Sequence, residues 1–346
     1  MSTAIFGVEY TLGQDTLSYE DLERRFGAEP ARKVLAGSGI RSRRVAPPGV
    51  CGSDLAFESA TRLFEKSTFR RDQIDLVIFC TQSADYLLPS SACILQDRLG
   101  LRKQCGAFDL NLGCTQYIYA LGVAHGMVSA GLANTVLVLT GDTMTQTLHP
   151  MDRSVVPLLG DGGSASIVAR TNNGAGFLGF EFGTDGSGHR DLIIPAGGFR
   201  IPRSTETACE CKDAEGNIRS QDHMHMNGLA IFHFAIWVVP ETVNRLLSRL
   251  CLTMQDIDLF LFHQANKYML EYLFKKLRLP REKTHVFLED IGNTSGSTMP
   301  IVLADALNAG KIKPGSLIFM MVFGVGLSWA ATVVRWPESG VPTQEI

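Results

Sequence analysis

The sequence predicts an α/β protein made of two similar halves, roughly residues 1–172 and 173–346, each rich in βαβ units. Residues 72–84 and 255–266 both read as a helix end followed by a continuously apolar run, which is typical of a strand buried on both faces. Further along each half, Gly113-Cys114-Thr115 and Gly292-Asn293-Thr294 occupy matching places. Such repetition of element order indicates a duplicated fold.

In the first half, residues 1–10 lack the charged and apolar regions of a signal peptide and predict a first strand. Residues 18–38 predict a helical stretch with charged residues on one face, and residues 47–52 a loop. A strand over 106–112, a helix over 115–130 and a strand over 134–139 follow. Glycines 160, 162 and 163 predict a hairpin that leads into an alternating strand.

The second half repeats this order with a strand before His263, a helix over 299–309 and a strand over 316–321. Gly324 and Gly326 predict the matching hairpin and the last strand. Residues 197–222 break the symmetry because they are polar, rich in charge and poor in apolar side chains. A surface segment of that length favours a functional role or a partner contact.

Composition excludes several classes of protein. The chain has 346 residues, 45% of them hydrophobic, and a formal net charge of −3 without a basic run, so nucleic-acid binding is not expected. The longest apolar stretch, residues 316–325, is too short to span a membrane and reads as a buried strand. Most of the eight cysteines lie among apolar or helical residues, which favours reduced thiols and a cytoplasmic location.

Cys114 is the candidate nucleophile. It follows a predicted strand and opens a predicted helix, so the positive end of the helix dipole is expected to lower the pKa of its thiol. Gly113 permits a sharp turn in front of it. The alternative is a buried structural cysteine, the usual place of a free thiol.

His263 and Asn293 are candidate partners of the thiol. His263 ends an apolar strand, at the sheet edge where α/β proteins collect their binding sites, although a satisfied core histidine is the alternative. Asn293 precedes a helix, where it would serve as a helix cap or as an amide donor to a reacting carbonyl. The N–H groups of Cys114 and Val325 are candidates for an oxyanion hole, although glycines around a tight turn need no functional reason. A thiol, an imidazole and an amide suit acyl transfer through a thioester.

A metal site is not expected. Cys209 and Cys211, with His223 and His225, offer four possible ligands in or beside the polar 197–222 segment. Zinc ligand pairs usually have a wider spacing than these, so a solvated loop is the better interpretation.

At this point the motifs resemble a known family, β-ketoacyl-acyl-carrier-protein synthase III. The resemblance runs from about Ser38 to Trp336, and the pair His-Gln-Ala-Asn and Gly-Asn-Thr-Ser is its most specific part. It implies a thiolase-like fold of two similar halves in five layers, αβαβα, and a homodimer without a cofactor. The matching segments are Gly113-Cys114-Thr115, Gly160-Asp-Gly-Gly163, His263-Gln-Ala-Asn266, Gly292-Asn293-Thr294-Ser295 and Phe323-Gly-Val-Gly326.

The resemblance implies a decarboxylating condensation. Cys114 would carry the acyl group of a primer, and His263 and Asn293 would stabilise the enolate formed from malonyl carried by an acyl carrier protein. The product would be a 3-oxoacyl carrier protein in fatty acid, related lipid or polyketide biosynthesis. Further contacts with a substrate carried by coenzyme A or a carrier are implied for Arg153, Lys267, Asn266, Leu88, Leu159 and Gly228.

Several positions depart from the family pattern. Lys33 and Gly37 stand where the family has a tryptophan and an arginine that hold coenzyme A, and Tyr268 replaces a carrier-docking arginine. Leu88 and Leu159 replace bulky aromatic residues of the acyl pocket. We therefore expect a primer longer than acetyl, donated by an acyl carrier protein or an unusual acyl-CoA.

Two other functions compete with condensation. One is transfer of the acyl group from Cys114 to an alcohol or amine, which would relax the need for Asn293. The other is a non-catalytic dimer partner, which an intact nucleophile disfavours.

Overall fold

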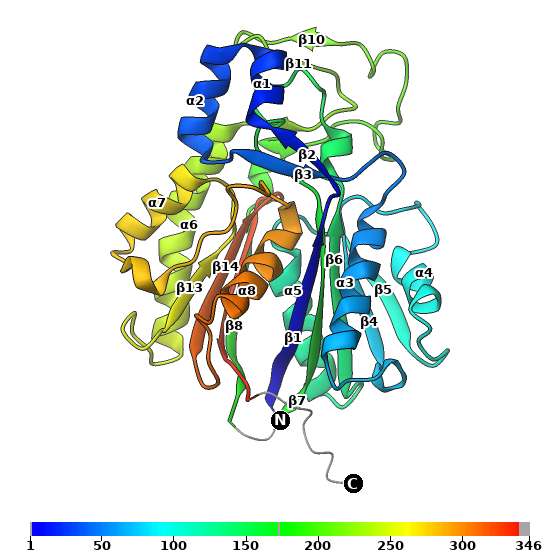
Figure 1. Ribbon diagram of the computed structural model, residues 1–346, viewed down its shortest axis with the longest axis vertical. Helices are drawn as coiled ribbons and strands as arrows, with labels where there is room; N and C mark the ends of the chain where they lie inside the picture. The colour runs from blue at the N-terminus through cyan, green and yellow to red at the C-terminus, as the bar shows by residue number, and fades with distance from the viewer. Residues whose placement is uncertain (1, 172–173, 339–346) are drawn as a thin grey trace.

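Two β-sheets stand side by side, with helices between them and on both outer faces (Figure 1). The computed structural model describes residues 2–171 and 174–338. The predicted boundary between the halves, at residues 172 and 173, lies outside the described residues. No helix within 2–171 and 174–338 is long and apolar enough to cross a membrane.

The first sheet has five strands. The two parallel pairs join β4 to β5 and β4 to β6, whereas β7 runs antiparallel to both β1 and β6. In spatial order the strands are β1 (Ser2–Leu12), β7 (Gly162–Thr171), β6 (Thr135–Asp142), β4 (Leu76–Cys80) and β5 (Gly106–Leu110).

The second sheet repeats that order with four strands, and Thr284 makes a single parallel bridge to Phe260 where the first sheet has β5. The parallel pair is β13 with β14, and the other pairs are antiparallel. The duplication predicted from the sequence is thus confirmed. The strands are β8 (Gly176–Thr184), β15 (Ser328–Arg335), β14 (Leu317–Gly324) and β13 (Leu259–Phe262).

Helices α5 (Gln116–Ser129) and α8 (Thr298–Asn308) form the central layer and share one hydrophobic core with both sheets. Helices α3 (Gly52–Lys66) and α4 (Ser91–Arg98) cover the outer face of the first sheet. Helices α6 (Gly228–Arg249) and α7 (Lys267–Lys276) cover the second. The outer helices bury one face, as in the Leu55, Ala56, Ser59, Ala60 and Leu63 stripe of α3. The predicted five-layer αβαβα arrangement is confirmed.

A smaller region closes the upper end of the sheets in Figure 1. The predicted helical stretch 18–38 is two helices, α1 (Tyr19–Phe26) and α2 (Ala28–Ser38), separated by Gly27 at φ 88°. The short strands of this region pair as β2 (Asp15–Ser18) with β3 (Ser42–Val45), β9 (Leu192–Ile193) with β12 (His225–Met226), and β10 (Cys211–Lys212) with β11 (Ile218–Arg219).

One turn was predicted wrongly. Strand β7 does pair antiparallel with β6, but residues 143–161 connect them, including the short 3₁₀ helix Met144–Thr147, so glycines 160–163 do not form a tight hairpin. Val325, Gly326 and Leu327 do form the tight β14–β15 hairpin. The predicted alternation of β7 and β15 is also absent, because helices cover both faces of each sheet and bury almost every position.

Candidate active site

A mostly apolar cavity of about 220 Å³ lies where the two halves meet. Cys114, Asn293 and Val325 line it, so residues from both halves contribute. Aliphatic and thioether side chains make up most of its remaining wall, among them Met144, Leu159, Ile193, Met224 and Met226. Such a wall suits an alkyl chain better than a polar ligand.

Cys114 sits between two glycine turns. A Cβ at Gly113 would lie 1.9 Å from Cγ1 of Val325, and a Cβ at Gly324 would lie 2.8 Å from Sγ of Cys114, so neither glycine can be replaced without movement. The thiol is 8% exposed. Burial raises its pKa to about 11, while hydrogen bonds from the Ser295 hydroxyl and from backbone N–H groups, including that of Val325, act in the opposite direction. The predicted lowering of this pKa is therefore wrong, because desolvation of the thiolate outweighs these donors.

His263 follows β13 and is 2% exposed. Burial lowers the pKa of its imidazole to about 3, so the ring is neutral near pH 7. Nδ1 lies 2.6 Å from the Thr298 hydroxyl, and the ring stands perpendicular to that of Phe323 with centroids 5.5 Å apart. Cys114 and Asn293 line the cavity, whereas His263 is not among its lining residues. It is joined to the site through Thr298, whose hydroxyl is also 3.0 Å from the Ser295 carbonyl.

Asn293 is held by its backbone. Gly292 has φ 77°, a left-handed conformation that favours glycine, and the Asn293 N–H donates to the Leu158 carbonyl at 2.8 Å. Its carbonyl accepts from the Gly160 N–H at 2.9 Å. The side-chain Oδ1 accepts from the Ser295 N–H at 2.9 Å, which leaves the NH₂ group to act as a donor to the cavity.

The residues predicted to hold substrate are spread over several places. Leu159 lines the cavity, whereas Arg153 and Asn266 line a separate surface hollow together with Lys33, Gly37 and Tyr268. Asn266 also caps α7, since its Oδ1 accepts from the Met269 N–H at 2.9 Å.

Three of these residues lie elsewhere. Lys267 packs against Gly39, where an added Cβ would lie 2.6 Å from the lysine Cβ, and Gly228 is the first residue of α6. Leu88 is 82% exposed on the loop before α4 and does not line the cavity of its own chain.

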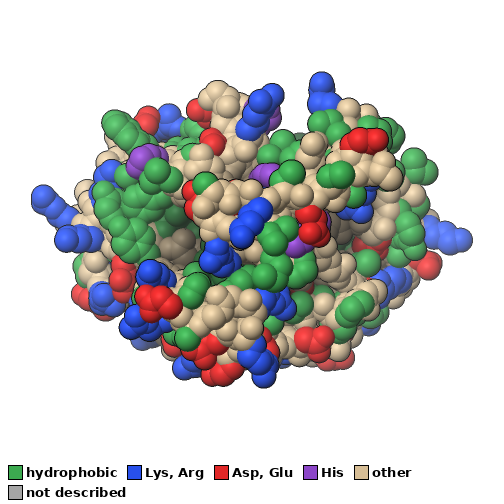
Figure 2. Space-filling view, turned by 90° about the horizontal axis from the view of Figure 1, so that it is seen from above, with side chains coloured by type: hydrophobic (Ala, Val, Ile, Leu, Met, Phe, Trp, Pro, Cys, Tyr) green, Lys and Arg blue, Asp and Glu red, His purple; other side chains and the backbone are tan. Residues whose placement is uncertain are grey.

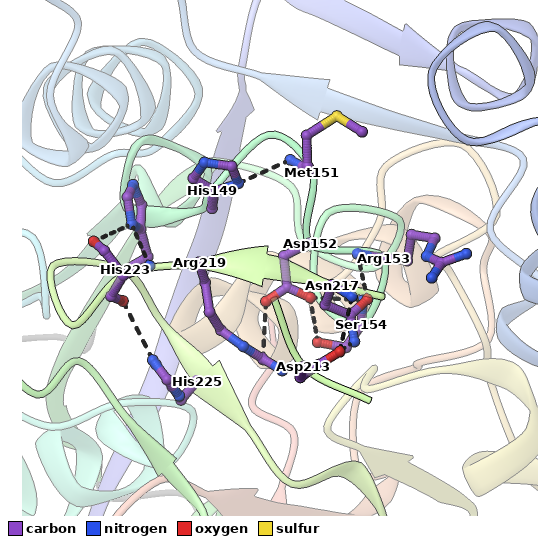
Figure 3. A network of polar contacts seen from close by, with 11 residues as sticks. His149, Met151, Asp152, Arg153, Ser154, Asp213, Asn217, Arg219, His223 and His225 are labelled. Atoms are coloured by element: carbon purple, nitrogen blue, oxygen red, sulfur yellow. Dashed lines mark hydrogen bonds and ion pairs between the residues drawn. The ribbon is translucent and has the colours of Figure 1, made fainter. Parts of the chain in front are cut away.

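The polar 197–222 segment is fastened to the loop 149–154 (Figure 3). The Arg219 guanidinium pairs with Asp152 at 3.0 Å and also with Asp213, and the Asp152 side chain is 1% exposed. The Arg153 N–H donates to Oδ1 of Asn217 at 3.1 Å, and its guanidinium donates to the Glu215 carbonyl. A buried carboxylate paired in this way holds the segment against the protein.

The histidines near this segment are engaged in local contacts. Nε2 of His149 lies 2.9 Å from Glu210, and the His149 and His223 rings stand perpendicular with centroids 5.0 Å apart. His225 contacts the Ser220 carbonyl through Nε2 at 3.3 Å (Figure 3). Within residues 2–171 and 174–338, no three His, Cys, Asp or Glu side chains are grouped to hold a metal ion.

Polar residues that the sequence reasoning missed surround the thiol. Nε2 of Gln82 donates to Oγ of Ser295 at 2.6 Å, and the Gln82 N–H donates to Asp142 at 2.8 Å. Asp142 is fully buried, which raises the pKa of its carboxyl to about 7. One signal pointed to Gln82, because it follows the carboxyl end of a buried parallel strand, as His263 does.

Comparison with known families gives two matches. Residues 108–186 match the family model described as 3-oxoacyl-[acyl-carrier-protein (ACP)] synthase III, and residues 247–336 match the model of its C-terminal part. The first match contains Cys114, and the second contains His263 and Asn293.

Similar proteins extend over nearly the whole chain. A β-ketoacyl-[acyl-carrier-protein] synthase III of Caldanaerobacter subterraneus subsp. tengcongensis is 35% identical, covering 98% of this chain and 99% of the relative. A crystal structure of a 3-oxoacyl-(acyl-carrier-protein) synthase III is 42% identical with a TM-score of 0.95, covering 97% of this chain and 100% of the other. That of a 3-oxoacyl-(acyl-carrier protein) synthase from Burkholderia xenovorans LB400 is 33% identical with a TM-score of 0.90, covering 99% and 96%.

Proposed function

The chain belongs to the 3-oxoacyl-[acyl-carrier-protein] synthase III family, and we propose that its reaction is divided between Cys114 and the pair His263 and Asn293. As a member of this family it is an acyltransferase that condenses an acyl thioester with malonyl-ACP to give 3-oxoacyl-ACP in fatty acid biosynthesis. Neither acyl transfer to an alcohol or amine nor a non-catalytic role is therefore needed to explain the chain. The main support for dividing the reaction between these residues is that Cys114 and Asn293 line one cavity but come from different halves of the chain.

In the first step, Sγ of Cys114 attacks the carbonyl carbon of the primer thioester. A new S–C bond forms, the donor's own S–C bond breaks, and the leaving thiolate takes up the proton that Cys114 gives up. The N–H groups of Cys114 and Val325 stabilise the tetrahedral oxyanion, a role supported by the Val325 backbone hydrogen bond to the thiol. The acyl chain then lies along the apolar wall that includes Leu159.

In the second step, the malonyl thioester loses CO₂, and its bonding electrons form an enolate. The Asn293 NH₂ group and Nε2–H of His263 donate to the enolate oxygen. This tautomer requires the Thr298 hydroxyl to donate its one hydrogen to Nδ1 of His263 in place of the Ser295 carbonyl, to which it is also within hydrogen-bond distance. The low imidazole pKa supports this role, because a neutral donor does not transfer its proton to the enolate. The enolate carbon attacks the acyl carbonyl, a C–C bond forms, and the Cys114 thiolate leaves.

We propose that the primer is longer than acetyl. The wall beside Cys114 contains several methionines, which are flexible and tolerate chains of different shape. The Arg153 guanidinium already donates to Glu215, which supports a donor that does not depend on this arginine for nucleotide binding. We therefore propose that the primer is donated by an acyl carrier protein or by an unusual acyl-CoA.

We further propose a cytoplasmic homodimer. Tyr86, Leu87 and Leu88 are consecutive and 62%, 84% and 82% exposed, which is unusual for apolar side chains facing water and supports burial against a second copy. Light scattering tests the dimer, and the double variant Leu87→Asp with Leu88→Asp should give monomers.

Two further observations concern the cytoplasmic location and the absence of a nucleic-acid partner. The eight cysteines are free thiols, as expected in a reducing compartment. On the face seen from above, basic and acidic side chains are interspersed with apolar ones rather than gathered in a basic patch, which supports a protein that does not bind nucleic acid (Figure 2).

The reaction is tested by incubating the protein with acyl-CoA or acyl-ACP primers of increasing length, together with malonyl-ACP. The products are followed by mass spectrometry. We expect 3-oxoacyl-ACP and CO₂ in equal amounts, with the fastest rate for a primer longer than acetyl. Equal rates with acetyl-CoA and with the best carrier-bound primer would overturn the proposed donor preference. A complete lack of 3-oxoacyl product from every primer would overturn the proposed division of roles.

A further inference from the structure

Gln82 links the two halves next to the candidate nucleophile. It follows β4 in the first half, and its Nε2 donates to Oγ of Ser295, in the second half, at 2.6 Å. Both residues line the cavity with Cys114. The side chain passes close to the turn before the thiol, since a Cβ at Gly113 would lie 2.7 Å from Oε1 of Gln82. Gln82 therefore occupies a position from which it can act on the nucleophile through Ser295.

The direction of the hydrogen bonds is fixed by chemistry. An amide NH₂ is only a donor, so the Ser295 oxygen must accept from Gln82. A hydroxyl has one hydrogen, and the Ser295 hydroxyl hydrogen-bonds to Cys114 in a way that favours the thiolate. We propose that Gln82 is a positioning residue that holds the Ser295 hydroxyl as a hydrogen-bond donor to the Cys114 thiolate. This proposal rests on the proposed role of Cys114 as the nucleophile.

The two ends of the Gln82–Ser295 link are fastened to one buried group. Asp142 accepts from the Gln82 N–H at 2.8 Å, from Nε2 of Gln116 at 3.0 Å and from the Gly296 N–H. Ser295 has φ 53°, a left-handed conformation that a serine seldom adopts, and the Gly296 contact holds the turn that contains it. The hydroxyl is thus presented by a backbone that is fixed from both halves.

The thiol needs such a donor because its surroundings oppose its ionisation. Burial and the nearby carboxylate of Asp142 both disfavour the thiolate, and the neutral imidazole of His263 supplies no positive charge. Hydrogen bonds to a sulfur anion are charge-assisted and stronger than those to a neutral thiol. Loss of the oriented hydroxyl should therefore make the thiolate rarer at any pH below its pKa.

The test is the pH dependence of Cys114 alkylation by iodoacetamide, measured by peptide mass so that the other cysteines do not interfere. Ser295→Ala removes the donor, and Gln82→Met keeps the length of the side chain but not its amide. Gln82→Glu offers only acceptors to the hydroxyl and should turn it away from sulfur. Ser297→Ala is the matched control, because Ser297 lies in the same turn but hydrogen-bonds to Thr140 and Gly162.

We expect the alkylation midpoint to rise by about one pH unit in Ser295→Ala, Gln82→Met and Gln82→Glu, with a roughly tenfold lower rate at pH 8. The control should keep the wild-type midpoint. The double variant Gln82→Met with Ser295→Ala should match Ser295→Ala alone, since both changes remove one donor. Unchanged midpoints in both folded Gln82 variants would overturn the proposal, whatever the result for Ser295→Ala, as would a full additional shift in the double variant.

Alkylation does not depend on condensation, so the two proposals can fail separately. A wild-type protein that alkylates at Cys114 with the expected variant pattern but makes no 3-oxoacyl product would contradict the proposed function alone. A protein that condenses normally but shows no variant effect on the midpoint would contradict only the role of Gln82.

Discussion

The N-terminal ends of α5 and α8 occupy equivalent places in the two halves, yet they present different chemistry. Cys114 precedes α5, and Asn293 precedes α8 with the extra turn Ser295–Ser297 between them. Each end is completed by the opposite half, since Gly324 packs on the thiol and Leu158 and Gly160 hydrogen-bond the Asn293 backbone. The comparison shows that the duplicated fold places two equivalent helix ends at the cavity, and that contacts with the opposite half give each helix end a different chemical environment.

The largest effect should follow removal of the thiol. Cys114→Ala should lower the condensation rate by on the order of 10⁴-fold or more, because Cys114 is the one thiol among the described residues that line the cavity. Malonyl decarboxylation should continue, since the Asn293 end is intact. The release of CO₂ and the formation of the 3-oxoacyl product are measured in parallel. The control is Cys93→Ala, which removes an exposed cysteine. Loss of both activities together would show that the two ends do not act separately.

The converse change should affect only the second step. Asn293→Ala should lower kcat for condensation by about 10²- to 10³-fold, the usual cost of one oxyanion donor. Acylation of Cys114 by the primer should proceed at the wild-type rate in rapid-quench experiments. The control is Asn308→Ala, an exposed change at the other end of α8, which should leave both the condensation rate and the acylation rate at their wild-type values. If Asn293→Ala lowered the acylation rate as much as the condensation rate, the two helix ends would not have separate roles.

Two buried groups, one in each half, should give opposite pH dependence of stability. Folding raises the Asp142 pKa from 3.8 to about 7, so its ionisation lowers the free energy of unfolding as pH rises across that window. Folding lowers the His263 pKa from 6.5 to about 3, so its contribution rises with pH from 3 to 6.5. Each slope is about 1.4 kcal/mol per pH unit, and the two nearly cancel between pH 4 and 6.5.

Urea unfolding between pH 4 and 6.5 measures these slopes. Relative to wild type, the free energy of unfolding of Asp142→Asn should rise with pH, because only the His263 contribution remains. That of His263→Ala should fall with pH for the opposite reason. Parallel curves for the wild type and both variants would show that neither group titrates differently in the folded and unfolded states.

The smallest effect should come from the cavity wall beside Asn293. Leu159 makes a single parallel bridge with Asn293 and lines the cavity. Leu159→Phe should shorten the accepted primer and lower kcat/KM for the longest one by about tenfold, with little change for acetyl, because the added ring fills space near the acyl chain. Leu159→Met, similar in volume, should keep the wild-type preference. An unchanged primer profile in Leu159→Phe would place the acyl chain elsewhere.

Much of the fold could be predicted because the repeat fixes its order. The apolar runs before Cys80 and His263 and the paired Gly-Cys-Thr and Gly-Asn-Thr segments define the two sheets and the central helices. The 160–163 turn was misread because a glycine cluster signals a turn without saying which strands it joins. The roles assigned to Cys114, His263 and Asn293 remain proposals that the expected variants test.

The missed features depend on contacts between residues far apart in the chain. No local pattern places Gln82 beside Ser295, or Arg219 beside Asp152. The prediction of a lowered Cys114 pKa was wrong for the same reason. The helix end is visible in the sequence, but the burial that outweighs it depends on contacts in the folded chain, such as the close approach of Gly324 to the thiol.

The most direct test is intact-mass analysis of the acyl-enzyme in two stages. The wild type, Cys114→Ala and Asn293→Ala are first incubated with a carrier-bound primer alone and then with malonyl-ACP. We predict one acyl adduct on the wild type and on Asn293→Ala, none on Cys114→Ala, and rapid discharge by malonyl-ACP in the wild type only. An adduct that persists on Cys114→Ala, or rapid discharge from Asn293→Ala, would contradict the division of the reaction between the two helix ends.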